Sequence, residues 1–166
     1  RALAENEFVL HYQPKVNMRT GRLVGAEALI RWLRPQRGLL APAEFLPVIE
    51  DHPLAIEVGE WVIGQALAQI KAWRQVGIET EVSVNLGASQ LQQVDFVPRL
   101  QAQLARHPEV PPSLLVLEVL ETSALSDLPH AAQVIAACRE SGVPCALDDF
   151  RTGYASLTYL RHLAVA

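Results

Sequence analysis

The chain has 166 residues, of which 50% are hydrophobic and 19% are charged, a balance typical of one soluble globular domain or part of one. Its formal net charge is −4 and its basic residues are scattered, which excludes the footprint of a protein that binds a nucleic acid polymer. No apolar run approaches the ~20 residues of a membrane-spanning helix, and the two cysteines lack the spacing of a zinc site.

Apolar periodicity predicts a strand hairpin, followed by helices and strands in alternation. Residues 8–15 alternate as a strand does, residues 17–21 are rich in turn formers, and residues 22–32 complete the hairpin. Residues 33–42 include two prolines and are predicted to be a loop. The remaining predicted elements are helices at 43–51, 54–77, 95–107, 128–141 and 156–162, and strands at 81–86, 114–119 and 143–148.

This alternation predicts parallel strands joined by crossover helices. An open sheet and a closed barrel both fit the pattern. A (β/α)₈ barrel needs roughly 250 residues, so a barrel means that the chain is incomplete. The chain begins at Arg1 without an initiator methionine and stops where another strand should begin. We therefore expect it to be a piece of a longer protein.

Acidic and amide residues lie at the ends of four apolar runs: VGAEALIRW, EVSVNLG, SLLVLEVLET and VPCALDDF. In chain order these residues are Glu27, Asn85, Glu118, Glu121, Asp148 and Asp149. A buried carboxylate is costly unless it is paired, hydrogen-bonded or bound to a metal. Because the carboxyl ends of parallel strands meet at one edge, the four runs predict one polar site. Oxygen ligands of this kind suit Mg²⁺ or Mn²⁺.

Each of these residues also has an ordinary structural interpretation. Glu27 shares a strand face with Leu29 and Arg31, so it could form a structural ion pair with the arginine. Asn85 could cap a strand-to-helix turn, and on its own that interpretation is favoured. Glu121 could be a solvated loop carboxylate, and the Asp148-Asp149 pair could cap the next helix. Gln13 joins the face of Glu27 if the hairpin register allows it.

Taken together, these motifs resemble the EAL family of bacterial cyclic-di-GMP phosphodiesterases. The matching stretches, in family order, are HYQPKVNMRTGRLVGAEALIRW, EFLPVIED, WVIGQALAQIKAW, VSVNLGASQL, LEVLET and DDFRTGYASLTYL. The resemblance implies that residues 1–166 are roughly the N-terminal two-thirds of an EAL domain. The implied fold is an α/β, TIM-type (β/α)₈ barrel with an antiparallel first strand, whose C-terminal strands are absent from this chain.

The implied activity is hydrolysis of cyclic-di-GMP to linear pGpG by two Mg²⁺ or Mn²⁺ ions in bacterial second-messenger signalling, with Ca²⁺ inhibitory. The implied ligands of one metal are Glu27, Asn85, Glu118 and Asp148, and those of the second are Asp148 and Asp149. The implied contacts to substrate are Gln13 and Arg31 on the phosphates and Leu29 in the dinucleotide groove. Glu121 would position the loop at 151–156, in which Arg151 stands where the family has glycine. The implied catalytic residues are Glu27, Glu121, Asp148 and Asp149.

The resemblance also implies that the domain forms a homodimer and is fused to GGDEF or sensor domains in the parent protein. The implied location is the cytoplasm, and the sequence does not decide whether the parent protein is anchored to a membrane. The family continues with a strand carrying a catalytic lysine and another carrying a metal-binding glutamate. Neither lies within residues 1–166, so this chain alone should be inactive. The alternative is a catalytically inactive EAL domain that acts as a cyclic-di-GMP receptor, and a protein-binding scaffold is a third class. The intact metal-site residues argue against both.

Overall fold

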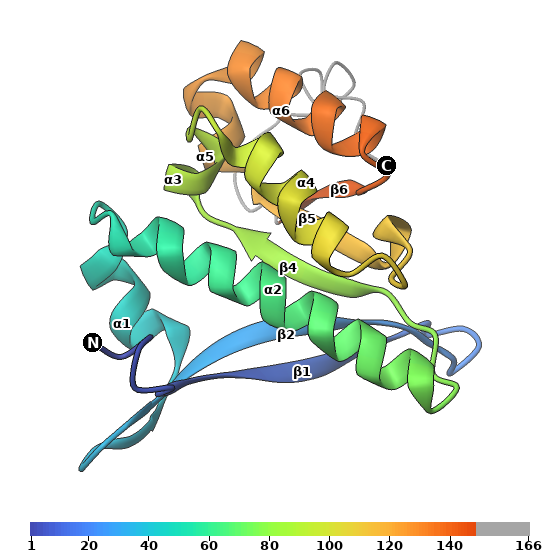
Figure 1. Ribbon diagram of the computed structural model, residues 1–166, viewed down its shortest axis with the longest axis horizontal. Helices are drawn as coiled ribbons and strands as arrows, with labels where there is room; N and C mark the ends of the chain where they lie inside the picture. Colours follow the sequence, from blue (N-terminus) through green and yellow to red (C-terminus); the bar gives the residue numbers. More distant parts are fainter. Residues whose placement is uncertain (149–166) are drawn as a thin grey trace.

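The computed structural model describes residues 1–148, and the strands within them form one sheet (Figure 1). The main path of the sheet runs β1-β2-β4-β5-β6, and β3 pairs with β2 at its side. The strands are β1 (Phe8–Val16), β2 (Leu23–Arg34), β3 (Gly38–Leu40), β4 (Val82–Leu86), β5 (Leu115–Leu120) and β6 (Cys145–Asp148). β1 runs antiparallel to β2, whereas β2, β4, β5 and β6 are mutually parallel neighbours. The carboxyl ends of four strands therefore share one edge, as the sequence predicts.

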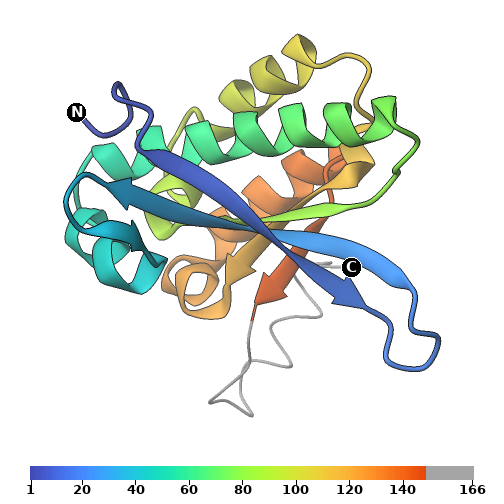
Figure 2. The ribbon, with the colours of Figure 1, turned by 90° about the horizontal axis from the view of Figure 1, so that it is seen from below.

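Helices follow the strands in the alternating order that the sequence predicts. They are α1 (Pro42–Ile49), α2 (Leu54–Gln75), α3 (Ala88–Leu91), α4 (Phe96–Arg106), α5 (Glu121–Ser126) and α6 (Leu128–Glu140), with a 3₁₀ turn at Pro112–Leu114. In Figure 2 the strands lie in front of α2, α4 and α6, so these helices cover one face of the sheet. Among the residues described, no helix is both long enough and apolar enough to cross a membrane.

The hydrophobic core lies between the sheet and these helices. The buried stripe of α2 repeats at helical spacing and comprises Val58, Val62, Ile63, Ala66, Leu67 and Ile70. Alternate residues of the central strands pack against it, and Val82, Val84, Leu115, Leu117 and Val119 are at most 1% exposed. Since successive strand residues point to opposite faces, the residues between them project from the face away from the helices.

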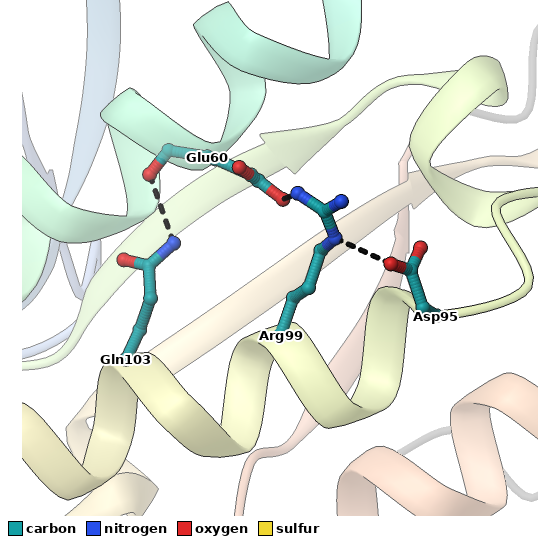
Figure 3. Close-up of polar contacts among 4 residues, drawn as sticks. All are labelled: Glu60, Asp95, Arg99 and Gln103. Atoms are coloured by element: carbon teal, nitrogen blue, oxygen red, sulfur yellow. Dashed lines mark hydrogen bonds and ion pairs between the residues drawn. The ribbon is translucent and has the colours of Figure 1, made fainter.

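A polar cluster joins α2 to α4 on the outer surface (Figure 3). The Arg99 guanidinium donates through Nη1 to Glu60 Oε1 at 2.8 Å and through Nε to Asp95 Oδ2 at 2.6 Å. Gln103 Nε2 donates to the Glu60 carbonyl at 3.1 Å. The hydrogen bond from Arg99 lowers the pKa of the Asp95 carboxyl. The cluster links the two helices at the outer surface, and it lies apart from the polar face of the sheet.

Three short elements differ from the predictions. The loop predicted at 33–42 is wrong in part, because β2 continues to Arg34 and β3 pairs back against it. Left-handed conformations at Gln36 (φ 70°) and Gly38 (φ 78°) make the tight turn that this hairpin needs. α3 and α5 were not predicted. They contain 4 and 6 residues, too few to show a helical period in the sequence.

Tyr12 gives a pH-dependent prediction. Its ring packs edge-on against Trp73 with centroids 5.0 Å apart, and burial raises the pKa of its hydroxyl from 10.0 to about 12. Between these values the unfolded chain releases the phenolic proton while the folded chain keeps it. The contribution of Tyr12 to stability is thus fully present below about pH 10 and is lost as the pH rises toward 12.

We therefore expect the free energy of unfolding to fall less steeply between pH 9.5 and 11.5 in Tyr12→Phe than in the unmodified protein. Urea titrations across this range measure the two slopes, and below pH 9 the difference in stability between the two proteins should be independent of pH. Equal slopes above pH 10 would contradict the burial of the hydroxyl.

Candidate active site at the open face of the sheet

The candidate site begins with the arrangement of β2. Ala26, Ala28 and Ile30 are 6%, 3% and 7% exposed and pack on the helix side. Their neighbours Glu27, Leu29 and Arg31 are half-buried and project from the other face. The predicted sharing of one strand face by Glu27, Leu29 and Arg31 agrees with this pattern.

Glu27 and Asn85 are brought together by the parallel pairing of β2 with β4. Glu27 is in register with Ser83, which places Asn85 two residues further along β4 and on the same face as Ser83. Asn85 Nδ2 donates to Glu27 Oε1 at 3.1 Å. Asn85 does not cap the following helix, since Gly87 occupies the N-cap position of α3. With its NH₂ group on Glu27, the amide would have to turn over to offer its oxygen to a cation.

Glu118 lies beside this pair, directly in register with Asn85 across β4 and β5. Its side chain is only 11% exposed and forms an ion pair with Lys15 of β1. Lys15 Nζ also donates to Ser83 Oγ at 3.0 Å, and Ser83 is 5% exposed. Neither Lys15 nor Ser83 is among the site residues predicted from sequence. The available signal was spacing, because Lys15 is two residues from Gln13 and therefore on the same face of β1.

The predicted substrate-binding residues surround these carboxylates. Gln13 is directly opposite Glu27 in the hairpin, so the two share a face as the sequence analysis allowed. Arg31 Nη1 donates to the backbone carbonyl of Ile30 at 2.9 Å, and no ion pair between Arg31 and Glu27 is found in the part of the chain described. The structural Glu–Arg pair considered from sequence is therefore not what holds Glu27.

The other predicted residues are placed by backbone alone or lie outside the described part of the chain. Asp148 is the last residue of β6, in register with Leu120. Glu121 is the first residue of α5 rather than part of a loop. Asp149, the loop at 151–156 and the helix predicted from residue 156 lie outside the described residues. Within residues 1–148, no three His, Cys, Asp or Glu side chains converge as a metal-binding group. The complete ligand set stays a prediction.

A pocket of about 440 Å³ opens beside the polar residues. Leu29 of β2 and Asn85 of β4 form its wall toward the polar face. Most of the remaining lining is apolar and comes from α1, α2 and the end of β4, including Leu46, Pro47, Ala55, Val58, Val62 and Leu86. A mostly apolar cavity of this size, with polar side chains at its edge, suits a ligand with flat apolar groups and a charged backbone.

A sheet of parallel strands behind an antiparallel first strand, with polar residues at one carboxyl edge, fits part of a TIM-type α/β barrel. The EAL domain family model matches residues 1–166, and the chain belongs to this family. It is 40% identical over 164 residues to the bifunctional diguanylate cyclase/cyclic di-GMP phosphodiesterase MucR of Pseudomonas aeruginosa, covering 98% of this chain and 24% of that protein. It is 37% identical over 164 residues to the signaling protein YkoW of Bacillus subtilis, covering 99% of this chain and 20% of that protein.

Solved structures agree with the family assignment. The PaMucR phosphodiesterase in complex with c-di-GMP matches with a TM-score of 0.93 and 40% identity, covering 99% of this chain and 67% of that one. The FimX EAL domain from Pseudomonas aeruginosa bound to c-di-GMP matches with a TM-score of 0.86 and 31% identity, covering 99% and 65%. The predicted family and the predicted TIM-type α/β fold are confirmed, with this chain carrying part of the barrel. The chain spans about a fifth to a quarter of the two relatives named above.

Proposed function

We propose that this chain is the N-terminal part of a phosphodiesterase domain that hydrolyses cyclic-di-GMP to linear pGpG. The observation that carries the proposal is the convergence of Glu27, Asn85 and Glu118 on one face, beside an apolar pocket. The family assignment and the identity to a cyclic di-GMP phosphodiesterase support the same substrate. A cyclic dinucleotide has the chemistry that such a site requires, namely apolar bases and anionic phosphates.

The donor set fits a Mg²⁺ or Mn²⁺ ion. All the side chains predicted to hold it offer oxygen, and the pairing of Glu118 with the Lys15 ammonium supports a cation at this place. Glu27, Asn85, Glu118 and Asp148 would hold one metal, and Asp148 with Asp149 the second. When bound, a metal pair activates water as the nucleophile and neutralises charge on the leaving oxygen.

The remaining residues of the site would bind and orient the substrate. Gln13 lies opposite Glu27 on β1 and Arg31 lies four residues further along β2, both on the face of Glu27, where they can donate to phosphate oxygens. Leu29 forms the wall between these residues and the apolar pocket, which would hold a guanine base away from water. In this scheme Glu121, at the start of α5, positions the loop at 151–156.

The alternative function is binding without hydrolysis, as a cyclic-di-GMP receptor. The observation that favours this alternative is the match to the FimX EAL domain, a structure with the same fold that is bound to c-di-GMP. Metal binding distinguishes the enzyme from a scaffold that only binds proteins, and turnover distinguishes the enzyme from the receptor. A homodimer in the cytoplasm, fused to GGDEF or sensor domains, completes the proposal for the whole protein.

The test is turnover by the full-length protein. We expect it to convert cyclic-di-GMP to pGpG with Mg²⁺ or Mn²⁺, as measured by chromatography. Ca²⁺ should bind but support little turnover, because its longer and looser coordination positions water poorly. Tight binding of cyclic-di-GMP with no pGpG at saturating Mn²⁺ would establish the receptor function instead.

A further inference from the structure

Lys15 lies within the candidate site but is not one of the residues predicted to bind metal or substrate. It lies on β1 opposite Gly25, on the same face as Gln13 and Glu27. Its ammonium contacts the carboxylate of Glu118 and donates to Ser83 Oγ at 3.0 Å. The ammonium of Lys15 therefore lies among the side chains that are proposed to bind metal.

Burial makes this ion pair different from those on the outer surface. The Glu118 side chain is 11% exposed, whereas the acidic partners in the helix-surface pair Lys71–Glu109 and in Arg74–Glu79 are 50% and 66% exposed. A carboxylate that has lost most of its water needs a compensating positive charge. Lys15 supplies that charge, and Ser83, itself 5% exposed, fixes the position of the ammonium.

A divalent cation on Glu118 would meet the ammonium at the same carboxylate. The two positive charges would repel each other, and metal binding would break the contact between Lys15 and Glu118. The lysine can leave, because its side chain is 40% exposed and its flexible four-carbon stem can carry the ammonium to water. Lys15 and the metal are therefore competitors for one ligand.

We propose that Lys15 is a positioning residue that sets the metal affinity of this site: it holds Glu118 in place before the metal binds and lowers the affinity for the metal. The inference rests on the proposed function, since it needs Glu118 to be a metal ligand. The Lys15–Glu118 ion pair then balances the charge of the site when no metal is bound. A divalent ion binds there only when its concentration is high enough to displace the ammonium.

Isothermal titration of Mn²⁺ into the metal-free full-length protein, without cyclic-di-GMP, tests this. Lys15→Met should bind Mn²⁺ roughly fivefold more tightly or better than the unmodified protein, since the competing charge is gone. Lys15→Gln, which keeps a donor for Ser83, should also bind more tightly. Lys15→Arg keeps the charge and should stay close to the unmodified protein. Lys71→Met is the matched control, because Lys71 pairs with Glu109 on the helix surface and should leave the affinity unchanged.

The outcomes separate this inference from the proposed function. Unmodified protein that binds no Mn²⁺ would overturn both. Mn²⁺ binding with an affinity that Lys15→Gln leaves unchanged or weakens would overturn only the role of Lys15. A gain in affinity equal for Lys15→Arg and Lys15→Gln would also overturn it, because the effect would then come from side-chain shape rather than charge. Far-ultraviolet circular dichroism confirms that each variant is folded before titration.

Discussion

Glu27→Gln should lower the turnover of cyclic-di-GMP in the full-length protein by about a thousandfold, which corresponds to ~4 kcal/mol of activation free energy. The substitution removes one negative charge from the proposed metal ligands. It keeps the size of the side chain and an oxygen that can still accept from Asn85 Nδ2, so the fold should be intact. Chromatography of pGpG at saturating Mn²⁺ measures turnover, and calorimetry should show weaker Mn²⁺ binding in the same variant.

Two further variants make this result specific. Asp148→Ala should lower turnover in the same way, because Asp148 is the residue proposed to bridge the two metals. Glu140→Gln removes the same charge from an exposed position at the C-terminal end of α6, away from the carboxyl ends of the strands. It should leave turnover unchanged. Turnover of Glu27→Gln close to that of the unmodified protein would place the metal site elsewhere.

Much of the fold and part of the site could be predicted because they depend on local patterns. The alternation of VGAEALIRW alone places Glu27 and Arg31 on the face opposite Ala28, and the structure agrees. Turn formers at 17–21 predict the hairpin that brings Gln13 opposite Glu27. These features need only neighbours in sequence and the period of the element.

The rest depends on register between strands that are far apart in sequence. Lys15 on β1 and Glu118 on β5 are 103 positions apart in sequence. Their contact depends on the register of the two strands between them, β2 and β4. No local pattern in HYQPKV distinguishes a lysine that points into the site from one in water. The link between Asn85 and Glu27 has the same origin, which is why capping was the favoured interpretation of Asn85 from sequence alone.

Leu117→Ala should have the largest effect on stability, lowering the free energy of unfolding by about 2–5 kcal/mol. Leu117 is 0% exposed and lies in the middle of the sheet, in register with Val84 on one side and Cys145 on the other. Truncation leaves a cavity between the sheet and the helices, which the packed neighbours can fill only in part. Urea unfolding, with the shift of the transition midpoint at a constant slope, measures the loss.

Val94→Ala serves as the control, because Val94 is 96% exposed and its truncation should change stability by less than about 0.5 kcal/mol. The comparison also bears on the site. Alternation along β5 means that burial of Leu117 on the helix side requires its neighbour Glu118 to project from the opposite face. If Leu117→Ala were as mild as the control, the register of β5 would be shifted by one residue, and Glu118 would face the core instead of Lys15.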